Sequence, residues 1–237
     1  MSALPGDKDK TYSQLLEIGP GMGVLTKILY PLYKERLFLV EIDNDLIPNL
    51  KKSYPLIENQ IFQEDFLALK LEDIFKEPFG IIGNFPYNIS SQILFKLVDY
   101  RHLIPELTGM FQKEVAERIV SPPGNKVYGL LSAWVQAFYK AEYLFTVNEG
   151  SFNPPPKVKS GVIRLVRKEN IDTGCNEELL LNIIKQGFNQ RRKTLRNSLS
   201  LWKPHFDKID SAILDKRAEQ LSSDDFVGLA KAFSRKL

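Results

Sequence analysis

The sequence predicts an α/β protein with a doubly wound, mostly parallel sheet, followed by a small helical domain. Short, mostly apolar runs at 15–18, 37–42 and 79–84, together with a further strand pattern at 59–65, alternate with helical patterns. Strands that are apolar throughout are typical of a parallel sheet with helices on both faces. After residue 176, by contrast, apolar residues recur only at helical spacing. The ligands of such a sheet bind at the carboxyl ends of its strands.

Length and composition narrow the class of protein. The chain has 237 residues, of which 43% are apolar and 26% charged, enough for one large domain and one small one. Its apolar runs fall well short of the roughly 20 residues that a membrane helix needs. The single cysteine, Cys175, excludes an internal disulfide, and His102 and His205 lack metal-ligand spacing. We therefore expect a cytoplasmic protein, with no metal and no membrane partner.

The fifth predicted strand marks the end of the first domain. This apolar run, at 162–166, follows the proline-rich stretch 151–160 and can complete the sheet. We therefore place the domains at 1–168 and 169–237. Four patterns predict helices in the second domain, at 179–188, 194–202, 212–221 and 224–233. Ser223 or Asp224 is a suitable N-cap for the last of these helices.

Positive charge is concentrated in the last third of the chain. Residues 1–150 carry 15 Lys and Arg against 19 Asp and Glu, a net charge of −4, whereas residues 151–237 carry 17 against 10, a net charge of +7. The densest block consists of Arg191, Arg192, Lys193 and Arg196. Such clustering is typical of a surface that neutralises phosphates, although a solvated helix surface gives the same pattern. A polyanion is therefore a candidate partner.

A glycine-rich segment, EIGPGMG, joins the first predicted strand to a helix. Its glycines, Gly19, Gly21 and Gly23, allow a sharp turn and a close approach of the backbone to a ligand. The spacing differs from the G-x-G-x-x-G of nicotinamide and flavin enzymes, because Val24 stands in place of the third glycine. We predict that these glycines and Glu17 bind a nucleotide-like cofactor without a pyrophosphate. A ligand-free turn and a nicotinamide-dependent oxidoreductase are the alternatives.

Acidic residues end the next two predicted strands. Glu41 stands where a carboxylate can accept hydrogen bonds from the ribose hydroxyls of a cofactor. Asp65 can accept a hydrogen bond from an adenine amino group, with Ile42 or Phe66 packed on the ring. Each acid alone could equally be a helix cap or a surface charge. Their positions at successive strand ends favour a shared binding site.

The fourth strand ends in Asn84, Phe85, Pro86 and Tyr87, the most specific feature of the sequence. The N6 nitrogen of adenine is a poor nucleophile because its lone pair is delocalised into the ring. An Asn oxygen and a nearby main-chain carbonyl can accept its hydrogens, while an aromatic ring stacks on a base held out of the RNA stack. A strong general base is not required. A proline turn capped by Asn84 is the structural alternative.

In these residues and the motifs around them, the chain resembles the KsgA-type small-subunit rRNA adenine dimethyltransferases. The resemblance covers nearly everything from Leu15 to the end, and its motifs are EIGPGMGVLT (17–26), VEID (40–43), EDF (64–66), IIGNFPYNISSQILFK (81–96), FNPPPKVKSGVIRL (152–165) and FNQRRKTLRNSL (188–199). It implies the Rossmann-like fold of class I methyltransferases.

The resemblance also assigns roles to individual residues. It implies that Gly19, Glu41, Asp65 and Asn84 contact S-adenosylmethionine. It implies that the residues from Asn84 to Tyr87 form the target-base pocket, with Phe152 as a second stacking residue. By position and charge, Lys157 and the 191–196 block are candidate RNA contacts.

The activity that the resemblance implies is dimethylation of N6 on two adjacent adenosines in the 3′-terminal hairpin of small-subunit (16S) rRNA, within the immature 30S particle and as part of ribosome biogenesis. We expect a monomer. The alternatives are a large-subunit rRNA methyltransferase of the erythromycin-resistance type and a non-catalytic RNA-binding or ribosome-assembly factor. The family has a further segment, with a Gln-x-Phe-Leu motif, ahead of the glycine turn, so we expect weak cofactor binding and weak activity from the chain as given.

Overall fold

The computed structural model describes residues 12–152 and 158–234. Within these ranges the chain divides into two compact units, one of residues 12–116, 142–152 and 158–167, and the other of residues 117–141 and 168–234. The break at 167/168 lies beside the expected boundary at 168/169. That residues 117–141 group with the second unit was not expected from the sequence.

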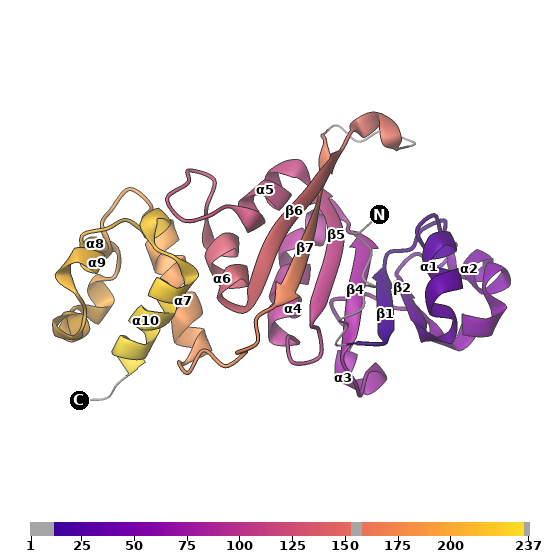
Figure 1. Cartoon of the computed structure of the whole chain (residues 1–237), viewed down its shortest axis with the longest axis horizontal. Helices are drawn as coiled ribbons and strands as arrows, with labels where there is room; N and C mark the ends of the chain where they lie inside the picture. The colour runs from indigo at the N-terminus through magenta and orange to yellow at the C-terminus, as the bar shows by residue number, and fades with distance from the viewer. Residues whose placement is uncertain (1–11, 153–157, 235–237) are drawn as a thin grey trace. The chain divides into compact units, whose positions relative to one another are not determined.

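One seven-stranded sheet organises the fold, in the order β3-β2-β1-β4-β5-β7-β6 (Figure 1). The pairs β1–β2, β1–β4, β2–β3 and β4–β5 are parallel, and β5–β7 is antiparallel. The doubly wound, mostly parallel α/β prediction is thus confirmed. The strands are β1 (Gln14–Ile18), β2 (Leu37–Glu41), β3 (Ile61–Gln63), β4 (Phe79–Asn84), β5 (Glu106–Gln112), β6 (Tyr139–Val147) and β7 (Ser160–Arg167).

The central strands are apolar because both of their faces are covered. Leu15 and Leu16 are neighbours in β1 and point to opposite faces of the sheet, yet both are fully buried. In β4, Ile81 and Ile82 are buried in the same way. Near 25 cal/mol per Å², burial of such side chains stabilises the sheet by about 1.5 to 3 kcal/mol each.

Helices follow most of the strands. The α-helices are α1 (Thr26–Tyr33), α2 (Ile47–Ser53), α3 (Leu71–Ile74), α4 (Ser90–Asp99), α5 (Lys113–Val120), α6 (Leu130–Phe138), α7 (Glu177–Asn189), α8 (Leu195–Ser198), α9 (Ser211–Leu214) and α10 (Ser223–Ser234). Short 3-10 helices lie at Lys34–Arg36, Pro55–Gln60, Tyr87–Ile89, Glu149–Ser151, Ser200–Lys208 and Ala218–Gln220. Among the described residues, no helix is both long and apolar enough to span a membrane.

The helical prediction for the end of the chain is correct at α7 and α10 and too simple between them. The patterns at 194–202 and 212–221 form short α and 3-10 segments instead of two continuous helices. The N-cap prediction for α10 is wrong by one residue. The Ser222 hydroxyl and amide both donate to the Asp225 carboxylate, and the Asp225 amide donates to the Ser222 hydroxyl, which is a reciprocal cap.

Candidate functional site

The first unit brings several strand ends together at one edge of the sheet. β1 lies between β2 and β4, so the loops after these parallel strands meet where the direction of winding reverses. Ile18 is in register with Val40 on one side and with Gly83 on the other. The glycine turn, Glu41 and Asn84 therefore emerge side by side, at the position where doubly wound sheets bind their ligands.

The glycine turn adopts a backbone that other residues rarely adopt. Gly19, Gly21 and Gly23 have φ angles of +66°, +57° and +76°. The Gly19 amide donates to the Val40 carbonyl at 2.9 Å, which fixes the start of the turn against β2. Around Gly21 a Cβ would meet nothing within 4 Å. The turn thus leaves open space beside its backbone.

The Glu41 carboxylate is held in a defined orientation by three backbone amides. It accepts hydrogen bonds on Oε1 from Ile42 at 2.9 Å and Asp43 at 3.0 Å, and on Oε2 from Gly21 at 3.0 Å. The residue is buried, and Oε2 takes part in one of these bonds only. Because a carboxylate oxygen can accept two hydrogen bonds, Oε2 retains capacity for a hydroxyl donor.

Glu17 supports the glycine turn instead of facing a ligand. It was predicted among the cofactor contacts, but only 1% of the residue is exposed. Its Oε2 accepts a hydrogen bond of 2.8 Å from the hydroxyl of Thr26, the first residue of α1. Glu17 therefore ties the end of β1 to the start of the helix. Burial raises the pKa of Glu17 to about 7, and the Thr26 hydrogen bond opposes that rise.

The residues predicted to surround an adenine ring differ in exposure. Ile42 is 66% exposed, so its side chain is available for packing on a ring. Asp65 is exposed, and its Oδ1 accepts a hydrogen bond from the Leu67 amide at 2.8 Å. Phe66 is only 4% exposed, with the Lys96 ammonium 4.9 Å from its ring centroid. The structure therefore favours Ile42 over Phe66 as the packing residue.

Asn84 lies beside the glycine turn. A Cβ added to Gly19 would lie 4.0 Å from the main-chain oxygen of Asn84. The Asn84 residue is exposed, and within the described residues its side chain makes no hydrogen bond. Both groups that the sequence analysis named as acceptors, a carboxamide and a main-chain carbonyl, are thus present at this strand end.

The Phe85 side chain is packed in the core and does not line the predicted target-base pocket. The prediction placed it with the target base, but its side chain is 1% exposed. The ring packs on Phe111, with centroids 5.0 Å apart, and occupies space that side chains at Gly83 and Gly109 would fill. The Phe85 amide donates to the Met110 carbonyl at 3.2 Å. These contacts hold the backbone of the motif against β5.

Tyr87 is held at both of its ends. Its hydroxyl is hydrogen-bonded to the Ser160 hydroxyl at 2.7 Å, and its carbonyl accepts from the buried Ser90 hydroxyl at 3.1 Å. Pro86 is exposed between the anchored Phe85 and this tyrosine. Ser160 was not among the residues predicted from the sequence. The only available signal was its place at the start of the strand after the prolines, which does not reveal its partner.

Of the remaining predicted residues of the first unit, one is described and one is not. Phe152 is half-buried, and its amide donates to the Glu149 carbonyl at 3.2 Å. Lys157 lies outside the described residues. The role of Phe152 as a second stacking residue stays a prediction.

In the second unit, the predicted basic block separates into paired and unpaired cations. Arg191 Nε donates to Glu219 at 2.8 Å, and Arg196 Nε donates to Asp215 at 3.0 Å. Arg192 and Lys193 are exposed and form no ion pair within the described part of the chain. Arg191 and Arg196 are therefore engaged within the second unit, whereas Arg192 and Lys193 are the exposed members of this block that form no ion pair with a described residue.

Two further exposed cations lie beside this block. Thr194 forms an isolated antiparallel bridge with Arg217, and the Leu195 amide donates to the Lys216 carbonyl at 2.8 Å. The backbone thus places Lys216 and Arg217, both exposed, alongside the chain that follows Lys193. These two cations were not predicted from the sequence because they lie 23 and 24 residues away from Lys193. Among the described residues, no group of three or more His, Cys, Asp or Glu could hold a metal ion.

Known proteins are similar in sequence to this chain along almost its whole length. The family model described as ribosomal RNA adenine dimethylase matches residues 10–234. The chain is 51% identical to a protein of Cytophaga hutchinsonii named ribosomal RNA small subunit methyltransferase A, over 95% of this chain and 88% of that protein.

Solved structures agree in fold. A crystal structure of a dimethyladenosine transferase from Plasmodium falciparum has a TM-score of 0.79 and 29% identity, and the match covers 94% of this chain and 90% of that one. A crystal structure of the 23S rRNA methyltransferase ErmE has a TM-score of 0.67 at 24% identity, over 94% and 91% of the two chains, and shares the fold.

The packing of Phe85 predicts a strong effect of Gly109→Ala. A Cβ at this position would lie 2.0 Å from Cε2 of the buried ring. We expect the free energy of unfolding to fall by about 2 to 3 kcal/mol, as for other overpacked cores, in urea denaturation. Gly228→Ala in α10 is the matched control, because its Cβ meets nothing within 4 Å, and it should not destabilise. Equal stability of the two variants would contradict the packing argument.

The raised pKa of Glu17 predicts a pH-dependent difference between the wild type and Glu17→Gln. Because the folded pKa is about 7 and the ordinary value is 4.5, the folded state binds the proton more tightly. Wild-type stability should therefore fall as the pH rises from 4.5 through 7. The glutamine variant, which stays neutral, should gain roughly 3 kcal/mol on the wild type across this window.

Urea denaturation of both proteins at pH 5 and pH 8 measures this gain. Glu35→Gln, at an exposed position, is the control and should show no such difference. A constant offset between Glu17→Gln and the wild type at the two pH values would refute the linkage.

Proposed function

The chain belongs to the ribosomal RNA adenine dimethylase family, and from that premise we propose that it dimethylates N6 of two adjacent adenosines in the 3′-terminal hairpin of small-subunit rRNA, with S-adenosylmethionine as methyl donor. The observation that carries the proposal is the position of Asn84, whose carbonyl lies next to Gly19 where the sheet changes winding direction. An acceptor for an amino group thus adjoins the cofactor turn.

The residues at this edge fit S-adenosylmethionine. The Glu41 carboxylate would accept hydrogen bonds from the ribose hydroxyls, and the open backbone at Gly21 leaves room beside it. Ile42 would pack on the adenine ring, and Asp65 would accept from the adenine amino group. When bound, the cofactor supplies an electrophilic methyl group on a sulfonium centre. At Gly21 the turn has no side chain, and a Cβ there would meet nothing within 4 Å, so a ligand can approach the backbone at this point.

The chain's own contribution to the reaction is orientation of the target base. The Asn84 side-chain oxygen and an adjacent main-chain carbonyl accept the two hydrogens of the adenosine amino group, which directs its lone pair toward the methyl group. Tyr87 stacks on the base, and its hydrogen bond to Ser160 fixes the plane of the ring. Phe152 is the proposed second stacking residue. No charged base is needed at N6, because the methylated nitrogen releases its proton readily after transfer.

The small-subunit target is favoured over the large-subunit alternative by the names of the relatives. The Cytophaga protein, 51% identical, is named a small-subunit methyltransferase, whereas ErmE is similar at the level of the fold. The exposed Arg192 and Lys193, with Lys216 and Arg217 beside them, would bind phosphates of the immature 30S particle. A ribosomal substrate also fits a cytoplasmic enzyme, for which we propose a monomer.

Asn84→Ala should abolish methyl transfer while RNA affinity changes less than twofold. The substitution removes the acceptor that orients the amino group but leaves the basic surface intact. Incubation with tritiated S-adenosylmethionine and immature small subunits measures transfer, and filter binding measures RNA affinity. Asn59→Ala, another exposed asparagine of the first unit, is the control and should retain activity.

Each result of that assay bears on the proposed activity. Label in adenosine with the wild type supports the enzyme. Binding without label would support a non-catalytic assembly factor. In a parallel incubation with large-subunit rRNA, label in that RNA alone would support the erythromycin-resistance type. Turnover in Asn84→Ala would exclude Asn84 from catalysis.

Replacement of Arg192 and Lys193 by alanine should weaken RNA binding and flatten its salt dependence. Each cation that no longer neutralises a duplex phosphate lowers the slope of log K against log salt by about 0.9, so the slope of the double variant should fall by about 1.8. Lys185→Ala with Lys203→Ala removes the same charge at other exposed positions and should leave the slope nearly unchanged. Equal slopes for both double variants would show that the charge effect is unspecific.

A further inference from the structure

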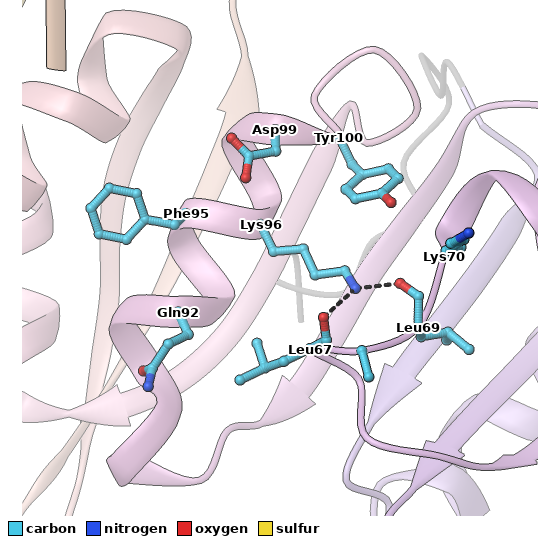
Figure 2. A pocket seen from close by; sticks show the side chains of 9 residues that line it. Leu67, Leu69, Lys70, Gln92, Phe95, Lys96, Asp99 and Tyr100 are labelled. Carbon is cyan, nitrogen blue, oxygen red and sulfur yellow. Dashed lines mark hydrogen bonds between the residues drawn. The ribbon is translucent and has the colours of Figure 1, made fainter. Parts of the chain in front are cut away.

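Lys96 is a buried lysine whose ammonium group is enclosed by backbone carbonyls. It lies in α4 and is only 8% exposed. Its Nζ donates to the carbonyls of Phe66 at 2.6 Å, Leu67 at 3.1 Å and Leu69. Figure 2 shows the side chain reaching from α4 to the carbonyls of Leu67 and Leu69. All three N–H donors of the ammonium are thus used by one loop.

The loop that Lys96 binds follows directly after Asp65 in the chain. The Asp65 carbonyl accepts from the amides of Ala68 at 3.0 Å and Leu69 at 3.1 Å, while its carboxylate accepts from Leu67. This tight turn directs its carbonyls toward the ammonium. Without a cation at that point, three carbonyls that converge on one atom would have no donor, which favours a different loop conformation.

Aromatic rings and charges complete the surroundings of the ammonium. The centroid of the Phe66 ring lies 4.9 Å and that of the Tyr100 ring 5.4 Å from Nζ. Burial lowers the pKa of Lys96, and the charges of Asp65 and Asp99 oppose this. The neighbouring pocket, of about 380 Å³, is also lined by Gln92 and Phe95 on the same helix.

The same helix carries the other half of the proposed site. Its first residue, Ser90, holds the Tyr87 carbonyl, and it follows directly on the motif that begins at Asn84. One helix is therefore bonded to the base motif near its start and to the Asp65 loop near its end. A shift of either segment is resisted by the other.

We propose that Lys96 is a positioning residue that fixes the Asp65 carboxylate for the adenine end of S-adenosylmethionine. This inference rests on the proposed function, because it concerns the affinity of the same cofactor site. Lys96 acts through the loop and not by contact with the ligand, since its three donors are already used by backbone carbonyls. Its replacement should therefore affect cofactor affinity far more than the rate at saturating cofactor.

The test measures S-adenosylmethionine binding by isothermal titration calorimetry for four proteins: wild type, Lys96→Met, Asp65→Asn and the double variant. We expect each single substitution to weaken binding about tenfold, and the double variant to be no weaker than the weaker single variant. Residues that act as a unit give such non-additive effects. In methyl-transfer assays, the KM for the cofactor should rise in Lys96→Met while kcat stays within about twofold.

Two further variants separate positioning from general destabilisation. Val98→Ala, at a fully buried position of the same helix, should lower the unfolding midpoint without changing cofactor affinity. Lys96→Arg keeps the charge, but its flat guanidinium cannot place three donors on carbonyls that converge on one nitrogen. It should bind the cofactor with reduced affinity even if Lys96→Met fails to fold.

The outcomes distinguish this inference from the proposed function. Wild-type affinity in both Lys96 variants, or additive effects of Lys96→Met and Asp65→Asn, would overturn the role of Lys96 while leaving the methyltransferase proposal intact. A wild-type protein that binds no S-adenosylmethionine would overturn both. Weakening by Val98→Ala equal to that of Lys96→Met would reduce Lys96 to an ordinary stabilising residue.

Discussion

The close approach of backbone to backbone between β1, β4 and β5 is the constraint on which the site depends. A Cβ at Gly83 would lie 2.6 Å from the Ile18 carbonyl, and one at Gly109 would overlap the Phe85 ring. Because these positions have no side chain, the ring can be seated flat against the strands, and Asn84 emerges beside the glycine turn. The spacing between the glycine turn and Asn84 is thus set by main chain and by one buried ring, both of which are stiffer than a surface loop.

Much of the sheet could be predicted from the sequence because its strands are buried on both faces. β1, β4 and β7 are each found within two residues of their apolar runs. β5 and β6 were missed for a physical reason that is clearest at β5. This strand contains Glu106, and a charged residue in a sequence does not indicate a buried strand. In the structure the Glu106 carboxylate is paired with Arg164 of β7 at 2.7 Å. An ion pair between residues 58 positions apart leaves no local signal.

At the candidate site, too, features that depend on neighbouring residues could be predicted, whereas contacts between segments far apart in the sequence could not. Residue type and spacing identified the glycine turn, Glu41 and Asn84, whose surroundings follow from their places at strand ends. The burial of Glu17, Phe66 and Phe85 depends on packing, and the pairing of Arg191 with Glu219 depends on a fold that joins distant segments. Sequence patterns therefore predicted which strand ends would lie together, but they could not separate exposed side chains at these ends from buried ones that support the backbone.

The hydrogen bond from the Gly21 amide to Glu41 has a consequence for ligand selectivity. The carboxylate is already stripped of most of its water and oriented by amides before any ligand arrives, so little reorganisation accompanies binding. Such a carboxylate accepts hydrogen bonds from a free diol and repels a phosphate on the same sugar. A nucleoside whose ribose is phosphorylated should therefore be rejected at this position by charge alone, whatever shape the rest of the molecule has.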